Sequence, residues 1–271
     1  MEVPLRFDPF QVFEASKSPP GLYARGKWLG EADSSIWKRD FHKTVSGLLA
    51  GQKQSGSWDQ SVLKTIRHLF GLHLTVRNAT TPVMKGLDWL MDRVHPRSAH
   101  IRGNLPAKIR SKELRGLPFT RGRSDLLVCG AALFLCTILG REDDPEVLAA
   151  YDWLAHDVLQ EDGRWCGWSC SNNILRAFVV HPRYSRTVQT TRAVQALGRV
   201  QNTDGKWPGD IPFFQTINAL AHLNSKAANR QLEAAFRRLC QTQNADGTWG
   251  QSDREWKTFL AVHALKNKGR L

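Results

Sequence analysis

The sequence has no hydrophobic run long enough to cross a bilayer, and its first residues lack the apolar segment of a signal peptide. The longest nearly apolar stretch, residues 126–140, has about 15 residues, whereas a spanning helix needs about 20. Pro4, Arg6, Asp8 and Pro9 interrupt the first residues. We therefore expect residues 126–140 to form a buried helix, and we expect no secretory leader.

Cysteine is scarce and irregularly spaced. The chain has five cysteines, an odd number without the spacing of a small disulfide-bonded domain, so we expect reduced thiols and a cytoplasmic location. Cys166 and Cys170 are separated by three residues rather than the two typical of zinc knuckles. A site that adds Cys129 and either His156 or His181 is conceivable, but buried thiols are the ordinary alternative in a helical core. We predict no metal site and no cofactor.

Acidic residues are also in short supply, since 25 Asp and Glu face 38 Lys and Arg and the formal net charge is +13. A basic balance of this size favours anionic partners such as phosphate groups, nucleic acid or acidic lipid. It also keeps a tryptophan-rich protein soluble. Composition leaves both interpretations open.

What the sequence does contain is a repeat. QNTDGKW ends at Trp207 and QNADGTW ends at Trp249, 42 residues later, and looser copies end at Trp58 and Trp165. A period of about 20 to 50 residues indicates one supersecondary unit copied along the chain. The Asp-Gly pair in the two close copies is a turn signal. Each copy is therefore expected to join two secondary-structure elements.

The segments that flank each copy predict two kinds of helix. Before the last copy, Leu232, Ala235, Phe236 and Leu239 lie at helical spacing with charged residues on the other side, which is typical of an outer, half-exposed helix. After each copy the apolar residues fall on more than one face, which predicts an inner helix walled on several sides. The sequence therefore predicts an all-α fold.

The repeated Q-x(2–5)-G-x-W string resembles the QW motif of squalene and oxidosqualene cyclases and of protein prenyltransferase β subunits. The stretch from about residue 117 to residue 266, which includes FFQTINAL and DREWKTFLAVHALK, resembles bacterial squalene-cyclase-like repeat proteins of unestablished activity. The resemblance implies an α/α toroid of paired helices whose central cavity holds an isoprenoid-like apolar ligand. The tryptophans of the motif are interpreted as packing residues that lock neighbouring repeats together.

We expect about five helix pairs in one domain over residues 37–271. They divide near residues 37–75, 82–140, 144–181, 185–224 and 227–267. Residues 1–36, which contain a Pro-Pro-Gly sequence, are expected to run as an irregular strap across one end. The ring then either closes with the strap or stays open against a partner.

The repeat breaks once. Trp58 and Trp165 are 107 residues apart, which is two periods of 42 residues plus 23 extra residues. The extra residues fall in a basic insert over residues 95–123. Insertions in a repeat array often map to a loop on the binding face. Arginines suit a diphosphate or a phospholipid head group, and the candidates for anion binding are Arg102, Arg110, Arg121 and Arg123. The alternative is a solvated surface loop. Because Phe119 is the one aromatic residue of the insert, we expect no nucleic-acid partner.

The sequence lacks the acidic motifs of the enzymes that it resembles. It contains neither D-x-D-D, with which class II terpene cyclases protonate a double bond, nor D-D-x-x-D, which ionises an allylic diphosphate through magnesium. The zinc-binding D-x-C pair of prenyltransferases is also missing, because Asp125 and Cys129 stand four residues apart. The remaining catalytic candidates are Asp125, Glu255 and His263, and a histidine at such a position is as readily a satisfied core residue.

In toroids of this kind the first turns of the inner helices face the central cavity. The resemblance therefore implies ligand-binding residues at these positions: Trp168, Cys170, Asn173, Phe214, Gln215, Asn218, Trp256 and Lys257. Aromatic side chains with a few convergent polar groups suit a largely apolar small molecule, with or without a phosphate group.

Two classes of function remain open. One is an enzyme of terpene-cyclase or prenyltransferase type that transforms an isoprenoid-like ligand. The other is a non-catalytic helical-repeat scaffold or ligand-binding protein, with a protein partner or a second copy of the chain on its helical faces. Association of the basic insert with an anionic membrane surface is a third hypothesis.

Overall fold

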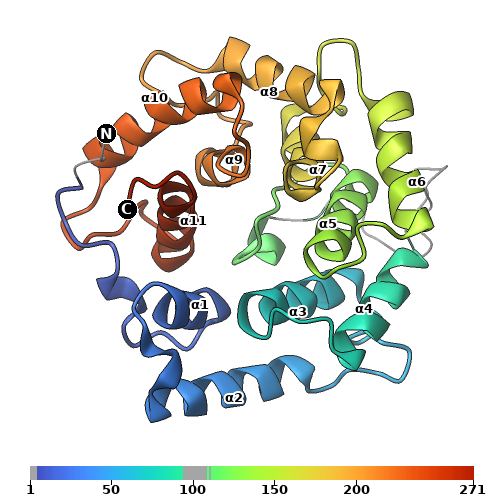
Figure 1. Ribbon diagram of the computed structural model, residues 1–271, viewed down its shortest axis with the longest axis vertical. Coiled ribbons are helices and arrows are strands. Elements are labelled where there is room, and N and C mark those ends of the chain that lie inside the picture. Colours follow the sequence, from blue (N-terminus) through green and yellow to red (C-terminus); the bar gives the residue numbers. More distant parts are fainter. Residues whose placement is uncertain (1–4, 94–108, 110) are drawn as a thin grey trace.

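Eleven α-helices form two concentric rings in the computed structural model of the protein, which describes residues 5–93, 109 and 111–271 (Figure 1). The inner ring consists of α1 (Pro19–Lys27), α3 (Val62–Thr75), α5 (Ser124–Ile138), α7 (Trp168–Val180), α9 (Phe213–Leu220) and α11 (Arg254–Asn267). The outer ring consists of α2 (Ser35–Leu49), α4 (Thr81–Met91), α6 (Pro145–Trp153), α8 (Val188–Val200) and α10 (Lys226–Thr242). This arrangement confirms the all-α toroid, with five outer helices each followed by an inner one.

The two rings differ in burial as the sequence predicts. On α10, Ala228, Leu232, Ala235 and Leu239 are buried on one face, and Ser225 caps the first turn by accepting a hydrogen bond from the Ala228 amide. On α5, every residue from 126 to 137 is buried, which confirms the buried helix expected there. None of the helices in the described ranges has the length and hydrophobicity that a membrane span requires.

Three of the four repeat tryptophans, Trp165, Trp207 and Trp249, donate a hydrogen bond to a carbonyl near the C-terminal end of an outer helix, whereas the buried Nε1 of Trp58 has no partner among the described residues. Trp165, Trp207 and Trp249 are each at most 1% exposed. The indole Nε1 of Trp207 donates a hydrogen bond to the Leu197 carbonyl of α8 at 3.1 Å, and that of Trp249 donates to the Leu239 carbonyl of α10 at 2.8 Å. The last carbonyls of a helix have no partner within the helix, so each indole satisfies one of them while its ring fills the core.

The glutamine and the glycine of the repeat join it to the next outer helix. Gln201 Nε2 donates to the Gly205 carbonyl of its own turn and to the Gln231 carbonyl of α10, both at 3.0 Å. Gly205 has a φ of +82°, and a Cβ there would lie 2.3 Å from the Ala234 carbonyl oxygen of α10. Glycine is therefore required for the left-handed turn and for the close approach of the two backbones.

The last copy of the repeat binds the N-terminal segment in the same way. Gln243 Nε2 donates to the Phe7 carbonyl at 2.8 Å, and its Oε1 accepts from the Arg6 and Phe7 amides. A Cβ on Gly247 would lie 1.9 Å from the Asp8 carbonyl oxygen. The segment around Asp8 therefore occupies the place that the next outer helix takes at the earlier copies.

The expectation of an irregular strap over residues 1–36 is wrong for residues 19–27, which form α1. Ser18 accepts a hydrogen bond from the Gly21 amide, and Pro19 stands at the first helical position, where the missing N–H costs nothing. Helix α1 packs against both α3 and α11, so it completes the inner ring. Of the two alternatives for the ring, the structure therefore shows the closed one.

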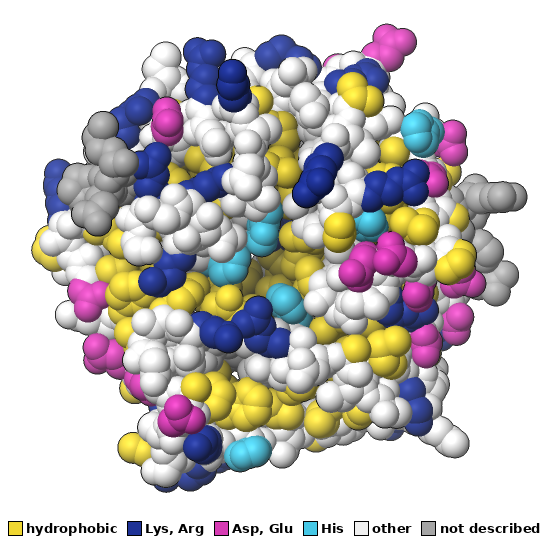
Figure 2. Space-filling model, viewed as in Figure 1, with side chains coloured by type: hydrophobic (Ala, Val, Ile, Leu, Met, Phe, Trp, Pro, Cys, Tyr) yellow, Lys and Arg dark blue, Asp and Glu magenta, His cyan; other side chains and the backbone are white. Residues whose placement is uncertain are grey.

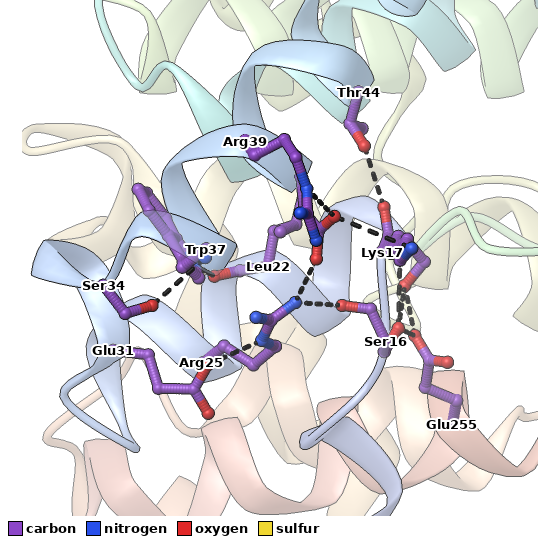
Figure 3. A network of polar contacts seen from close by, with 12 residues as sticks. Ser16, Lys17, Leu22, Arg25, Glu31, Ser34, Trp37, Arg39, Thr44 and Glu255 are labelled. Atoms are coloured by element: carbon purple, nitrogen blue, oxygen red, sulfur yellow. Dashed lines mark hydrogen bonds and ion pairs between the residues drawn. The ribbon is translucent and has the colours of Figure 1, made fainter.

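Helix α1 is fastened to α2 through a buried guanidinium group (Figure 3). Arg25, of which 2% is exposed, donates from Nη1 to Asp40 at 3.1 Å and from Nε to Glu31 at 2.8 Å. The same Nη1 donates to the Ser16 carbonyl at 3.1 Å, and Trp37 Nε1 donates to the Leu22 carbonyl at 3.0 Å. These contacts hold the N-terminal inner helix in a ring that it joins without a repeat motif of its own.

The substitution Arg25→Met is expected to loosen α1 selectively. It removes the buried donors, and Asp40 keeps only the more distant ammonium of Lys17 at 3.7 Å and guanidinium of Arg39 at 3.9 Å. Hydrogen–deuterium exchange of the α1 amides should become at least about 10-fold faster, while exchange in α8 stays unchanged. Arg39→Met, which removes an exposed partner of the same carboxylate, is the control. Equal exchange in the two variants would contradict this role of Arg25.

Candidate functional site

Two neighbouring spaces lie between the inner helices. The first, which we call the rim cavity, has a volume of about 490 Å³ and lies at the N-terminal ends of α1 and α11 and along α3; its walls include Leu48, Arg67, Phe70, Leu74, Glu255 and Trp256. The second, which we call the inner chamber, has a volume of about 100 Å³, and all six inner helices line it; its walls include Tyr23, Phe70, His73, Phe134, Arg176, Asn218, Phe259 and His263. Phe70, Leu74 and Trp256 belong to both, so their side chains form the common wall.

The end of the basic insert closes part of the ring. Arg67 on α3 donates to the Arg115 and Glu113 carbonyls, both at 2.6 Å, and so anchors the segment over the rim cavity. Leu117 and Phe119 are at most 2% exposed, and Pro118 between them lines the inner chamber. The interruption of the repeat therefore supplies a wall of the site, and residues 111–123 are not a solvated loop along their whole length.

The inner chamber holds a buried cation. Arg176 on α7 is 2% exposed, and its Nη1 and Nη2 donate to Asn218 Oδ1 at 2.9 Å and to the Gln215 carbonyl at 2.7 Å. Its Nε is buried without a partner, and among the described residues no Asp or Glu lines the chamber. Burial lowers the pKa of Arg176 to about 9, so the group still carries its charge at pH 7.

Three histidines line the chamber, His73, His222 and His263, and burial lowers the pKa of each so that they are neutral at pH 7. Burial, followed by the charges of Arg77 and His263, lowers the pKa of His73 to about 3, and the Nδ1 of this ring has no partner. Burial, followed by Arg176 and Arg77, lowers the pKa of His263 to about 4. Since Arg176 donates to Asn218 Oδ1, the Asn218 amide nitrogen faces His263 Nδ1 at 3.2 Å. The proton of neutral His263 is therefore assigned to Nε2.

The apolar part of the walls is aromatic. Trp256 and Phe259 stack with ring centroids 5.5 Å apart, and Phe70 meets Trp256 edge to face at 5.8 Å. Phe134 lies beneath the Arg176 guanidinium, whose carbon is 6.0 Å from the ring centroid. Figure 2 shows histidine side chains around the hollow at the centre of one face of the ring. The site thus combines aromatic surface with cationic and neutral polar groups.

Of the expected ligand-binding residues, Asn218 and Trp256 line the chamber, and the Gln215 carbonyl accepts a hydrogen bond from Arg176. The others lie elsewhere. Asn173 Oδ1 accepts a hydrogen bond from the Thr120 amide and Asn173 Nδ2 donates one to the Thr120 carbonyl, both at 2.8 Å. Cys170 Sγ accepts a hydrogen bond from the Arg123 amide. Neither space is lined by Trp168, Phe214 or Lys257.

The acidic candidates are held by partners outside the inner chamber. Glu255 lines the rim cavity, where its carboxylate accepts hydrogen bonds from the hydroxyls of Ser16 and Ser18 (Figure 3). Asp125 pairs with Arg123 at 2.5 Å. Of the three catalytic candidates, only His263 lines the chamber.

The expected anion-binding arginines are divided between described and undescribed residues. Arg121 lies 3.8 Å from Asp210, and Arg123 pairs with Asp125, so each of these two has an acidic partner. Arg102 and Arg110 lie outside the described residues. Within the described residues, no group of three or more His, Cys, Asp or Glu side chains is arranged to hold a metal ion.

The sequence analysis missed Arg176 and His73, although the period of 42 residues contains a signal for part of the site. Phe134, Arg176, Asn218 and Leu260 follow each other at intervals of 42 and all line the inner chamber. One helical turn later, Ile138, Val180 and His222 repeat the pattern. Equivalent positions of successive repeats face the ring axis, so a polar residue in this register is a candidate.

The sequence matches no known family profile, and no curated protein is significantly similar to it. Solved structures are similar in fold. A protein from Actinoplanes superposes with a TM-score of 0.61 at 15% identity over 92% of this chain and 89% of that one. A variant of the type II terpene cyclase MstE from Scytonema, in complex with its substrate geranylgeranyl dihydroxybenzoate, has a TM-score of 0.60 at 12% identity over 94% and 87%. Ligand-free MstE has a TM-score of 0.58 at 13% identity over 94% and 89%. The chain therefore has a terpene-cyclase-like fold.

Proposed function

We propose that the protein binds an isoprenoid-like apolar ligand at the centre of its terpene-cyclase-like toroid, with the apolar chain in the rim cavity. The observation that carries the proposal is the cavity itself. Its volume of about 490 Å³ lies within the range of roughly 300–1,000 Å³ typical of small-molecule sites, and Leu48, Phe70, Leu74 and Trp256 give it apolar walls. MstE, which shares the fold, was solved with a geranylgeranyl compound, and this supports a prenyl chain as the ligand.

The side chains favour binding over protonation-initiated cyclisation. Such a reaction needs an acid that faces a double bond of the ligand and is protonated at the working pH. Glu255 lines the rim cavity, where its carboxylate accepts hydrogen bonds from two serine hydroxyls, and Asp125 lines neither space and is paired with Arg123. His263 is neutral because its pKa is about 4, so about one molecule in a thousand carries the extra proton at pH 7. We therefore assign a ligand-binding role without catalysis.

A cavity-filling variant tests the location. Leu48→Trp places an indole in the rim cavity, whereas Leu49→Trp makes the same change at a half-buried position of α2 outside the cavity. The affinity for geranylgeraniol, measured by native mass spectrometry and by tryptophan fluorescence, should fall at least about 10-fold in Leu48→Trp and stay unchanged in Leu49→Trp, because the added ring takes the ligand's volume.

Two results would overturn the proposal. If the unmodified protein does not bind geranylgeraniol, or binds it equally well with Trp at position 48, the rim cavity is not the ligand site. If incubation with geranylgeraniol or geranylgeranyl diphosphate yields cyclic products by gas chromatography and mass spectrometry, the assignment of a non-catalytic role is wrong.

A further inference from the structure

The guanidinium group of Arg176 is buried between the inner helices, and no Asp or Glu of the described residues lines the chamber around it. Neutral hydrogen-bond acceptors satisfy its two terminal nitrogens, and its Nε–H is left without a partner. Burying a charge in this way is costly unless an opposite charge compensates it. The guanidinium group of Arg77 also lines the chamber, and its carbon lies 5.3 Å from the centroid of the Tyr23 ring. The described walls of the chamber thus carry two cations and no carboxylate.

The three arginines that line the rim cavity already have partners. Arg67 donates to two backbone carbonyls, Arg115 lies 3.7 Å from Asp253, and Arg254 lies 2.8 Å from Asp246. Among the described residues around the two spaces, Arg176 is therefore the buried cation that lacks an acidic partner.

The polar groups near Arg176 suit an anion with oxygen atoms. The free Nε–H of Arg176 offers a charge-assisted hydrogen bond, and a neighbouring terminal nitrogen completes the fork that carboxylates and phosphates prefer. His73 Nδ1 is buried and unpaired, and as the N–H tautomer it would donate as well. A volume of about 100 Å³ is too small for a prenyl chain but is sufficient for one such group.

We propose that the inner chamber binds the anionic head group of the ligand, a carboxylate or a phosphate, through Arg176. This inference rests on the proposed function, since the apolar chain of the same ligand occupies the rim cavity. Phe70, Leu74 and Trp256 line both spaces, so a ligand that occupies both has to pass between these side chains.

The test compares two probes with the same prenyl chain, geranylgeranoic acid and geranylgeraniol. The unmodified protein should bind the acid about 10- to 100-fold more tightly at pH 7.5, because only the acid compensates the buried charge. Arg176→Met should remove this preference and leave the affinity for the alcohol unchanged. Arg237→Met removes an exposed arginine from α10 and so changes the net charge as much as Arg176→Met does. This control variant should keep the preference for the acid.

A second variant tests the inference independently, in case Arg176→Met does not fold. Asn218→Asp is nearly isosteric and places a carboxylate 2.9 Å from Arg176 Nη1, so the chain itself supplies the missing anion. This variant should bind the acid and the alcohol equally, because the chain then supplies the anion itself. Persistence of the acid preference in folded Arg176→Met or in Asn218→Asp would overturn the inference.

The remaining outcomes separate the two proposals. Equal affinity of the unmodified protein for acid and alcohol would overturn the role of Arg176 and leave the apolar site intact. No binding of either probe would overturn the proposed function and this inference together. Acetate is the control probe, because it carries the carboxylate without the prenyl chain. If acetate binds as tightly as the prenyl acid, the chamber takes free small anions, and the inference about the head group is overturned.

Discussion

Replacing Trp207 with alanine is expected to lower the free energy of unfolding by about 3–5 kcal/mol, the range for removing a large buried aromatic side chain. The ring is 1% exposed, and its loss leaves both a cavity and the Leu197 carbonyl of α8 without its donor at 3.1 Å. Urea unfolding followed by circular dichroism measures the difference.

Two controls divide this loss into its parts. Trp207→Phe keeps most of the ring and removes the hydrogen bond, so it should cost less than the alanine variant. Trp168→Ala removes an indole that is only half-buried, at the start of α7, and should cost less again. A loss below about 1 kcal/mol in Trp207→Ala would contradict the role of the motif in holding the repeats together.

Acidification is expected to destabilise the protein through the chamber histidines. An unfolded histidine has a pKa near 6.5, whereas burial and the neighbouring Arg77 hold the pKa of His73 at about 3 in the folded state. As the pH falls below 6.5 the unfolded chain takes up a proton that the folded chain does not, so unfolding is favoured. His73 should contribute a loss of about 2 kcal/mol between pH 6.5 and pH 4.5. His263, with a pKa of about 4, should add a similar loss.

The measurement is the free energy of unfolding in urea at a series of pH values. His73→Gln should remove about 2 kcal/mol of the difference between pH 6.5 and pH 4.5, because the amide does not titrate. His42→Gln, at an exposed position of α2, is the matched control and should leave the pH profile as it is. If His73→Gln and the unmodified protein show the same profile, the ring of His73 is not kept neutral by the fold.

Much of the fold could be predicted from the sequence because a repeat is a local pattern. The spacing of Gln201, Gly205 and Trp207 recurs 42 residues later, and the helices on each side of it fall where the apolar periodicity places them. The N-terminal inner helix was missed for the opposite reason. Residues 19–27 carry no copy of the motif, and the Pro-Pro-Gly sequence indicates a turn unless Ser18 is recognised as a cap.

The site was predicted less well than the fold. The resemblance indicated the first turns of the inner helices, and Asn218 and Trp256 do line the inner chamber. Arg176 lies two turns into α7, in a segment whose apolar neighbours predict a core helix. A single charged residue in such a segment is ambiguous, because the sequence does not show whether an acidic partner lies within reach.

The sequence by itself determined the repeating unit, the all-α class and the place where the repeat is interrupted, since each depends on residues near one another in the chain. The toroid was implied by the resemblance of the repeat to the QW motif. Only the tertiary structure decided that the ring is closed, because closure depends on the contact of Gln243 with the backbone of Arg6 and Phe7 across more than 230 residues. It also decided that the segment at the end of the interrupted repeat lines the chamber, and that within the described part of the chain Arg176 has no acidic partner there. Charge compensation depends on distances in space, which the order of residues does not contain.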